Sequence, residues 1–164
     1  MKKRKPASAP ATQRDTEPAG FDFRHAPGFL IRRAHQRSVA AFTEATAGWD
    51  VTPVQFAILQ ALMDEPGADQ VTLAQRVCFD AATSGSVIGR LEARGWVRRE
   101  ADAGDRRRKL LWLTAAGQQL VRAMKAPVTR AQQRMLAPLN ERESRTLLRL
   151  LARMALADDQ AGQA

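Results

Sequence analysis

The sequence predicts a mainly α-helical protein with one small β-hairpin. Beyond about residue 27, apolar side chains recur at helical spacing through most of the chain, and residues that begin or end helices separate the segments. One short helical segment is followed by a tight turn and a longer helical segment, which is the helix-turn-helix pattern. Two short segments with strand character then flank a charged loop that contains Gly104. Together these features predict a winged helix-turn-helix joined to a helical dimerisation region.

Bulk properties narrow the class of protein further. The chain has 164 residues, enough for one compact domain with a helical extension, and its formal charge of +9 favours a polyanionic partner. No apolar run approaches the roughly 20 residues that span a bilayer, so we expect no membrane partner and a cytoplasmic location. The single cysteine, Cys78, cannot form an internal disulfide, which agrees with a reducing compartment.

The two ends of the chain differ from its centre. Residues 1–20 combine Lys, Arg, Pro, Ala, Ser and Thr without apolar periodicity, so we expect a flexible basic tail that aids solubility or contacts DNA. Residues 158–164 are expected to form a second flexible tail. Residues 21–50 are assigned to an N-terminal dimerisation helix, with the helix itself running from 27 to about 47 before Gly48.

Residues 51–113 are expected to form the DNA-binding region. Its first helix opens with Thr52 as N-cap and Gln55 as capping-box partner and ends near Met63. The hairpin follows later, with strands predicted at residues 96–100 and 109–113.

Two helices between these elements form the predicted helix-turn-helix. The shorter helix is expected to be capped by Thr72 with Gln75 as its partner and to reach about Cys78. The longer helix is expected to begin after an Asp80 cap and to end at Arg94, with Gly95 following as the left-handed residue that suits a helix terminus.

Residues 114–157 are assigned to C-terminal dimerisation helices. Thr114 is expected to cap a long helix that reaches about residue 137 with a kink at Pro127, and Asn140 precedes a final helix with a leucine-rich stripe. With the first helix, this stripe exposes more apolar surface than one chain covers, which favours a homodimer. The alternative is an ordinary helical bundle within one chain.

The sequence offers no constellation for catalysis. It contains no Gly-rich phosphate loop, no Cys/His metal spacing and only two histidines, His25 and His35, and its paired serines Ser84 and Ser86 lack a nucleophile-elbow context. We therefore expect no enzyme activity, no catalytic residues, no cofactor and no metal site.

Small and hydroxyl-bearing residues begin the second helix of the helix-turn-helix. Such side chains let a helix approach base edges closely, and Ser and Thr can bond to bases or phosphates, so Thr83, Ser84 and Ser86 are candidate DNA contacts. Arg90 and Arg94 lie further along and can reach phosphates or a guanine edge. By itself this pattern also fits an ordinary polar surface helix.

The hairpin loop strengthens the DNA-binding interpretation. Guanidinium groups on a protruding loop suit a narrow minor groove, where negative potential is concentrated. An acidic residue inside the cluster can fix the direction of a neighbouring arginine through a bidentate pair. The candidate residues of this loop are Asp105, Arg106, Arg107 and Arg108.

These segments resemble the MarR family of winged-helix regulators, and the resemblance covers nearly everything between about residues 27 and 156. It rests on four series in the family's order, TPVQF (52–56), LEARGWVRR (91–99), DAGDRR (102–107) and LTAAG (113–117). The resemblance implies a homodimer built from the first, fifth and sixth helices that reads a pseudo-palindromic operator in double-stranded DNA. It also implies that Arg107 is the minor-groove wing arginine and that Asp105 orients it.

Members of this family commonly act as repressors that a small aromatic, often anionic, effector releases from DNA. Residues 26–36 resemble regulators of aromatic-acid or N-heterocycle degradation. Arg32 and His35 lie three residues apart on one helix face and could meet a carboxylate, while Trp49 and Phe56 could supply aromatic walls. Alternatively, His35 packs at the dimer interface and Arg32 pairs with an acid.

Two further questions follow from the sequence. Some MarR-type regulators sense peroxide through a cysteine near the start of the first helix, whereas Cys78 follows the third, so we expect a small core residue there. A nonspecific architectural nucleic-acid-binding protein, held to DNA by the tail and wing charges alone, is the alternative function.

Overall fold

The computed structural model describes residues 22–79, 81–105 and 107–155. Both predicted tails, the Asp80 cap and Arg106 lie outside these residues. The elements follow the predicted order and confirm the fold class: a short 3-10 turn η1 (Phe23–His25), helices α1 (Pro27–Ala45), α2 (Pro53–Asp64), α3 (Gln70–Arg76) and α4 (Ala81–Ala93), strands β1 (Val97–Ala101) and β2 (Lys109–Leu113), and helices α5 (Ala115–Leu136) and α6 (Glu141–Ala155).

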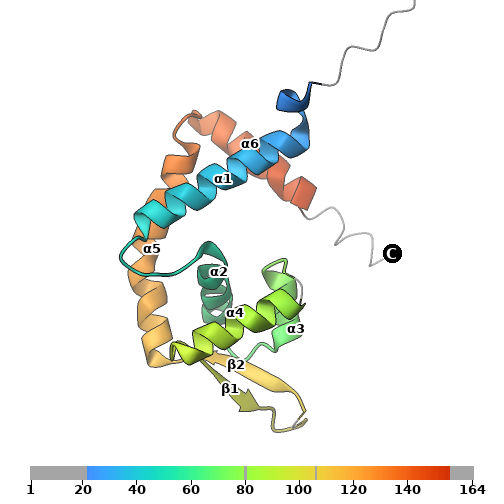
Figure 1. Ribbon diagram of the computed structural model, residues 1–164, viewed down its shortest axis with the longest axis vertical. Coiled ribbons are helices and arrows are strands. Elements are labelled where there is room, and N and C mark those ends of the chain that lie inside the picture. Colours follow the sequence, from blue (N-terminus) through green and yellow to red (C-terminus); the bar gives the residue numbers. More distant parts are fainter. Residues whose placement is uncertain (1–21, 80, 106, 156–164) are drawn as a thin grey trace, which may run out of the picture.

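The molecule has two ends joined by one long helix (Figure 1). One end carries α1 and α6, whose ribbons overlap in this view, and at the other end α2, α3, α4 and the hairpin form the winged unit. Helix α5 begins beside the hairpin, packs along α1 and reaches the end where α6 starts. A displacement at the α1–α6 end therefore has a direct mechanical route to the winged unit.

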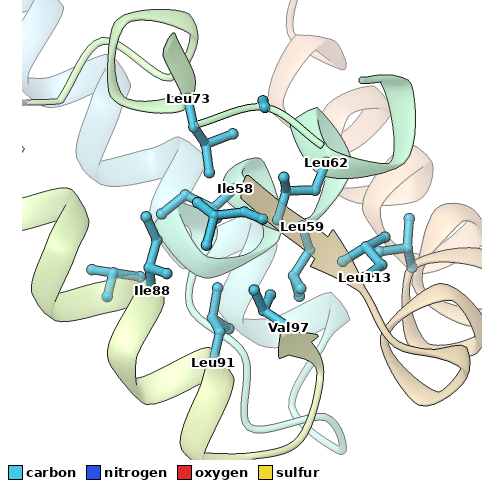
Figure 2. Close-up of a cluster of buried hydrophobic side chains, with 12 residues drawn as sticks. Ile58, Leu59, Leu62, Leu73, Ile88, Leu91, Val97 and Leu113 are labelled. Atoms are coloured by element: carbon cyan, nitrogen blue, oxygen red, sulfur yellow. The ribbon is translucent and has the colours of Figure 1, made fainter. Parts of the chain in front are cut away.

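The core of the winged unit draws on each of its elements (Figure 2). Apolar residues at helical spacing in α2, α3 and α4 meet the inward-facing residues of both strands and the first turns of α5. Burying one such side chain contributes about 1.5–3 kcal/mol, so this cluster fixes the unit. Its buried members include Ile58, Leu59, Leu62, Leu73, Val87, Ile88, Leu91, Val97, Leu111, Leu113 and Val121.

A second, smaller cluster connects the winged unit to α1 and α5. Phe42, Val51 and Met124 are its buried members, and Trp49 and Phe56 pack against them. The rings of Phe42 and Phe56 lie with centroids 6.0 Å apart at 54°, a tilted geometry that aromatic pairs favour. This cluster holds the residues after α1 against the start of α2.

Helix caps account for most boundaries. The predicted capping box is confirmed: Gln55 N–H donates to Thr52 Oγ1 at 3.2 Å, and Thr52 N–H donates to Gln55 Oε1 at 2.9 Å. The predicted Thr72 cap is wrong: the carboxylate of Asp69 accepts the Thr72 N–H at 2.9 Å, so Asp69 is the N-cap and α3 begins three residues earlier than predicted.

The hairpin pairs β1 with β2 in antiparallel register, with Val97 opposite Leu113. The connection between α2 and α3 lies along the other edge of β2. There Gly67 N–H donates to Leu111 O at 2.9 Å and Leu111 N–H donates to Ala68 O at 3.0 Å. Residues 67–69 therefore act as a third, short edge that ties the helix-turn-helix to the wing.

The LTAAG series has a clear structural purpose. Thr114 caps α5 as predicted, accepting the Gly117 N–H at 3.1 Å, and its hydroxyl donates to Gly95 O at 2.7 Å. A β-carbon at Gly117 would lie only 2.2 Å from Trp96 O. Gly95 has φ +71, which confirms the left-handed residue predicted after α4. Gly117 thus lets α5 start directly against the hairpin, while Gly95 supplies the left-handed residue that ends α4.

Helix α6 is amphipathic, yet none of its residues is buried. Asn140 and Glu143 cap its start reciprocally, each backbone N–H donating to the other side chain at 2.9 Å. Its apolar face carries Leu148 at 54% and Met154 at 61% exposure. Among the described helices, none is long and apolar enough to cross a membrane.

Candidate nucleic-acid interface and effector cavity

The outer face of α4 carries three of the predicted DNA contacts. Thr83, Ser86 and Arg90 are exposed and follow one another at helical spacing, so they share one face. Gly89 lies beside them with no atom within 4 Å of the position a β-carbon would take. Small and polar residues thus leave this face open to a close approach.

The exposure predicted for Ser84 is wrong. Its side chain is fully buried, at 0% exposure, on the same face as Val87, Ile88 and Leu91. The spacing of these four positions is that of a helix stripe that faces a core. Ser84 therefore belongs to the packing of α4 and not to its outer face.

Arg94 is also occupied within the molecule. One terminal nitrogen, Nη1, donates to Asp50 O at 2.6 Å and lies 3.1 Å from the Asp50 carboxylate. The guanidinium carbon lies 4.0 Å from the centroid of the Trp96 ring, a cation–π geometry. Arg94 thus joins the end of α4 to the α1–α2 connection, whereas the sequence suggested a group reaching outward.

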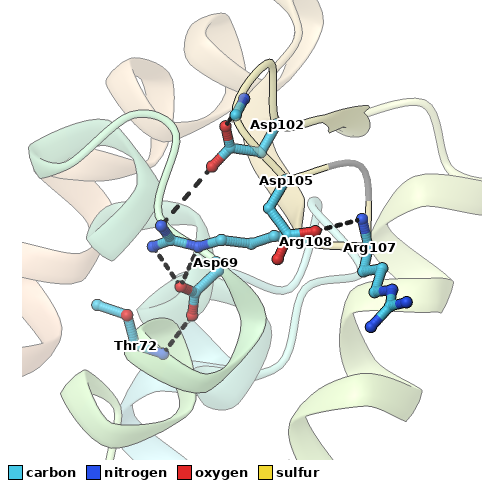
Figure 3. Close-up of polar contacts among 7 residues, drawn as sticks. Asp69, Thr72, Asp102, Asp105, Arg107 and Arg108 are labelled. Carbon is cyan, nitrogen blue, oxygen red and sulfur yellow. Dashed lines mark hydrogen bonds and ion pairs between the residues drawn. The ribbon is translucent and has the colours of Figure 1, made fainter.

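A cluster of charges fixes the base of the wing (Figure 3). Arg108 pairs with Asp69 through Nε at 2.8 Å and Nη2 at 2.5 Å, and its Nη1 lies 3.7 Å from Asp102. The Thr72 backbone N–H and the Arg108 guanidinium hold the pKa of Asp69 below its usual range. Arg108 is therefore a tether between the wing and the cap of α3.

Arg107, the neighbour of Arg108 on the wing loop, is not tethered in this way. Asp105 accepts the backbone N–H of Arg107 at 2.9 Å, and no ion pair joins Asp105 to a described arginine. The expected bidentate pair is thus replaced by a turn that shapes the backbone. The guanidinium of Arg107 is exposed, has no acidic partner among the described residues and points away from the Arg108 cluster (Figure 3).

A cavity of about 550 Å³ lies among α1, α2, α5 and the end of α3. Two of the four predicted effector residues, His35 and Phe56, line it, together with Phe42 and Val128. Arg32 and Trp49 do not line it: Arg32 is exposed on α1 one turn before His35, and Trp49 packs in the Phe42 cluster. The prediction of one four-residue site is therefore corrected to two of its members.

The charged group that the sequence reasoning missed is Arg76. It is the last residue of α3, lines the cavity and forms an ion pair with Glu65. No local pattern marks it, because the cavity forms only when α1 and α5 close over the helix-turn-helix. The described residues contain no group of three or more His, Cys, Asp or Glu that could hold a metal ion.

Cys78 also departs from its prediction. It is exposed rather than packed in the core, and it adopts φ +54 in the turn between α3 and α4. The tight turn needs a left-handed residue there, and a cysteine fills a position that glycine occupies at lower cost.

Comparisons with known proteins agree with this geometry. A MarR family model matches residues 49–108. The HTH-type transcriptional repressor NicR of Pseudomonas putida is 34% identical over 161 residues, which cover 98% of this chain and 99% of NicR. BpsR of Bordetella bronchiseptica, solved in a study of how 6-hydroxynicotinic acid regulates its DNA binding, is 34% identical with a TM-score of 0.79, covering 82% of this chain and 96% of BpsR.

A second solved structure is similarly close. PcaV of Streptomyces coelicolor, in complex with its natural ligand, is 35% identical with a TM-score of 0.78, and the match covers 86% of this chain and 99% of PcaV. The matches cover nearly the whole length of NicR and PcaV. The family consists of DNA-binding regulators and not enzymes. The chain therefore belongs to the MarR family of winged helix-turn-helix transcriptional regulators.

Proposed function

We propose that this regulator binds a pseudo-palindromic operator in duplex DNA as a homodimer, with α4 in the major groove and the wing in the minor groove. The observation that carries the proposal is the exposed guanidinium of Arg107 on the wing loop, which has no acidic partner in the part of the chain that the structure describes, together with the open polar face of α4. An unneutralised arginine on a protruding loop is attracted by a narrow minor groove.

On α4, each remaining candidate has a role that fits its chemistry. The hydroxyls of Thr83 and Ser86 can bond to base edges or phosphates, and Arg90, one turn further, can reach a guanine edge or a phosphate. Arg94 and Arg108 support this surface by holding the end of α4 and the base of the wing. Half-sites one helical turn apart, about 34–36 Å, would fit two such units in a dimer.

The dimer itself is proposed from α6, α1 and α5. Helix α6 leaves Leu148 and Met154 exposed, and α1 leaves Leu30 and Ile31 at 50% and 46% exposure. Exposed apolar faces of this size are unfavourable in a single chain, and contact with a second copy would bury them. In this arrangement residues 21–50 and 114–157 form the dimerisation region, and residues 51–113 form the DNA-binding region.

The DNA proposal is tested with the full chain and the DNA upstream of its own gene. At near-physiological salt we expect the affinity for this DNA to exceed that for a scrambled duplex of equal length by about a thousandfold or more. Arg107→Ala should weaken the preferred complex, while Arg24→Ala, which removes the same charge from η1 at the end of the molecule away from the hairpin (Figure 1), should not. Equal affinity of the wild-type protein for both duplexes would instead favour nonspecific architectural binding.

We also propose that the regulator is a repressor released by a small aromatic effector in the cavity beside His35 and Phe56. The cavity of about 550 Å³ falls within the range of small-molecule sites and has both aromatic and polar walls. It also touches α1, α2, α3 and α5, so an occupant that prefers one arrangement of these helices can change the separation of the two α4 helices.

The effector proposal is tested by calorimetry with 6-hydroxynicotinic acid, the compound in the BpsR study. We expect His35→Ala to weaken binding and Arg32→Ala to leave it unchanged, since Arg32 lies outside the cavity. Release of bound DNA should follow the same order. Unchanged affinity in the His35 variant would remove this residue from the site.

A further inference from the structure

The effector cavity has one arginine, Arg76, and one carboxylate, Asp64, among its described lining residues, and Asp64 Oδ1 accepts a hydrogen bond from Gln60 Nε2 at 2.9 Å. Arg76 is the last residue of α3 and lines the cavity together with His35 of α1. Phe42 and Phe56 add aromatic surface to the same lining. A flat aromatic anion in this cavity would find aromatic surface and a guanidinium, the group that binds carboxylates through charge-assisted hydrogen bonds.

The same guanidinium already has a partner. Arg76 forms an ion pair with Glu65, the C-cap residue of α2. Glu65 Oε2 is shielded from solvent and accepts no hydrogen bond from the described residues, so the guanidinium is its main stabilising contact. The Glu65 side chain as a whole is 42% exposed, so it can turn to water if Arg76 is taken by another anion.

Glu65 stands immediately before the segment that holds the wing. Residues 67 and 68 bond to Leu111 of β2 at 2.9 and 3.0 Å, and Asp69 pairs with Arg108. A change in the C-cap of α2 therefore acts on the residues that fix the hairpin. The cavity and the wing are connected through one short, continuous piece of backbone.

The geometry points to Arg76 as the residue that binds an anionic effector in this cavity, with Glu65 as a resident counterion that the effector displaces. This inference rests on the proposed effector site and adds its charge selectivity and its link to DNA release. In the effector-free state the Glu65–Arg76 pair steadies residues 66–69 and the wing. Capture of Arg76 by an effector carboxylate frees Glu65 and loosens that support.

Substitutions of Glu65 and Arg76 should change the affinity for the anionic effector in opposite directions. Glu65→Gln removes the competitor, so the anion binds more tightly, while the wing loses its support and DNA binds more weakly. Arg76→Gln removes the anion partner itself. Arg32→Gln is the matched control, because Arg32 carries the same charge on α1 but lies outside the cavity.

The experiment measures binding of 6-hydroxynicotinic acid and of its uncharged carboxamide to the full chain by calorimetry. Wild type and Arg32→Gln should prefer the acid by about tenfold or more, the size of one charge-assisted bond. Arg76→Gln should bind the two compounds equally, Arg76→Lys should retain part of the preference, and Glu65→Gln should bind the acid several-fold more tightly than wild type. Thermal unfolding of each variant checks that it is folded.

Separate outcomes overturn separate steps. If Arg76→Gln keeps the preference for the acid, or Glu65→Gln fails to strengthen acid binding, the displacement is wrong while the effector cavity stands. Unchanged DNA affinity in Glu65→Gln overturns the link to the wing. If the wild-type protein binds neither compound, the effector proposal fails and this inference fails with it.

Discussion

Replacing Gly117 with alanine should break the contact between α5 and the hairpin. The new β-carbon would lie 2.2 Å from Trp96 O and 3.0 Å from Trp96 C, and real β-carbons essentially never come within 3.0 Å of another heavy atom. Both atoms are backbone, so no side-chain rotation relieves the clash. Either α5 must move or residues 95–97 must move.

The expected cost follows from three terms. Overpacking costs about 1–3 kcal/mol, and a backbone clash belongs at the upper end of that range. Displacing α5 also weakens the hydrogen bond from Thr114 Oγ1 to Gly95 O, worth about 1 kcal/mol. Alanine returns about 1 kcal/mol as a better helix former. The free energy of unfolding should therefore fall by about 3 kcal/mol, a large share of the roughly 5–15 kcal/mol typical of a domain.

Urea unfolding followed by circular dichroism, at one fixed protein concentration, measures this change. Gly89→Ala is the matched control, because its β-carbon meets no atom within 4 Å in the middle of α4. That variant should gain up to about 1 kcal/mol from helix propensity alone. If Gly117→Ala proved as stable as the wild type, the close approach of α5 to the hairpin would be wrong.

Three further substitutions test the charge and backbone features of the winged unit. Arg108→Ala should lower the free energy of unfolding by about 1 kcal/mol in urea titrations, as expected for a half-exposed ion pair. If stability is unchanged and DNA affinity falls strongly, Arg108 is a DNA contact instead of a tether. Asp69 has a lowered pKa, so its stabilising effect is present above about pH 4 and is lost as the pH falls further. Asp69→Asn should therefore have a lower free energy of unfolding than wild type at pH 7, and this difference should shrink in acid. A difference that stays constant with pH would refute the charge interaction. Cys78→Gly should raise stability by up to about 1 kcal/mol in thermal unfolding by relieving φ +54, whereas a loss of stability would show that the thiol contributes contacts.

Short-range sequence patterns were sufficient to predict most of the fold. The capping box at Thr52, the cap at Thr114 and the left-handed Gly95 depend on neighbours within a few residues, so their patterns are visible in the sequence. The α3 cap was harder, since Asp69 and Thr72 are both good N-caps three residues apart. Asp69 also pairs with Arg108, 39 residues away, and no local pattern contains that contact.

The candidate site was less predictable than the fold because long-range packing decides it. Ser84 looks like a surface hydroxyl by residue type, although its spacing to Ile88 and Leu91 already fits the buried stripe. Arg94 and Arg76 were ambiguous for another reason: their partners, Asp50 and Glu65, come from different elements. Arginine side chains are long enough to turn inward or outward, so only the packed structure distinguishes a tether from a free contact.

Two copies of this chain are proposed to read duplex DNA with α4 in the major groove and the Arg107 loop in the minor groove. Hydroxyl-radical footprinting of the full chain on a duplex enriched from a random pool tests it most directly. We predict symmetric protections on one face of the duplex, about one helical turn apart, and loss of the outer minor-groove protections in Arg107→Ala with the central ones retained. A uniform or asymmetric footprint, or one that Arg107→Ala leaves unaltered, would contradict this arrangement.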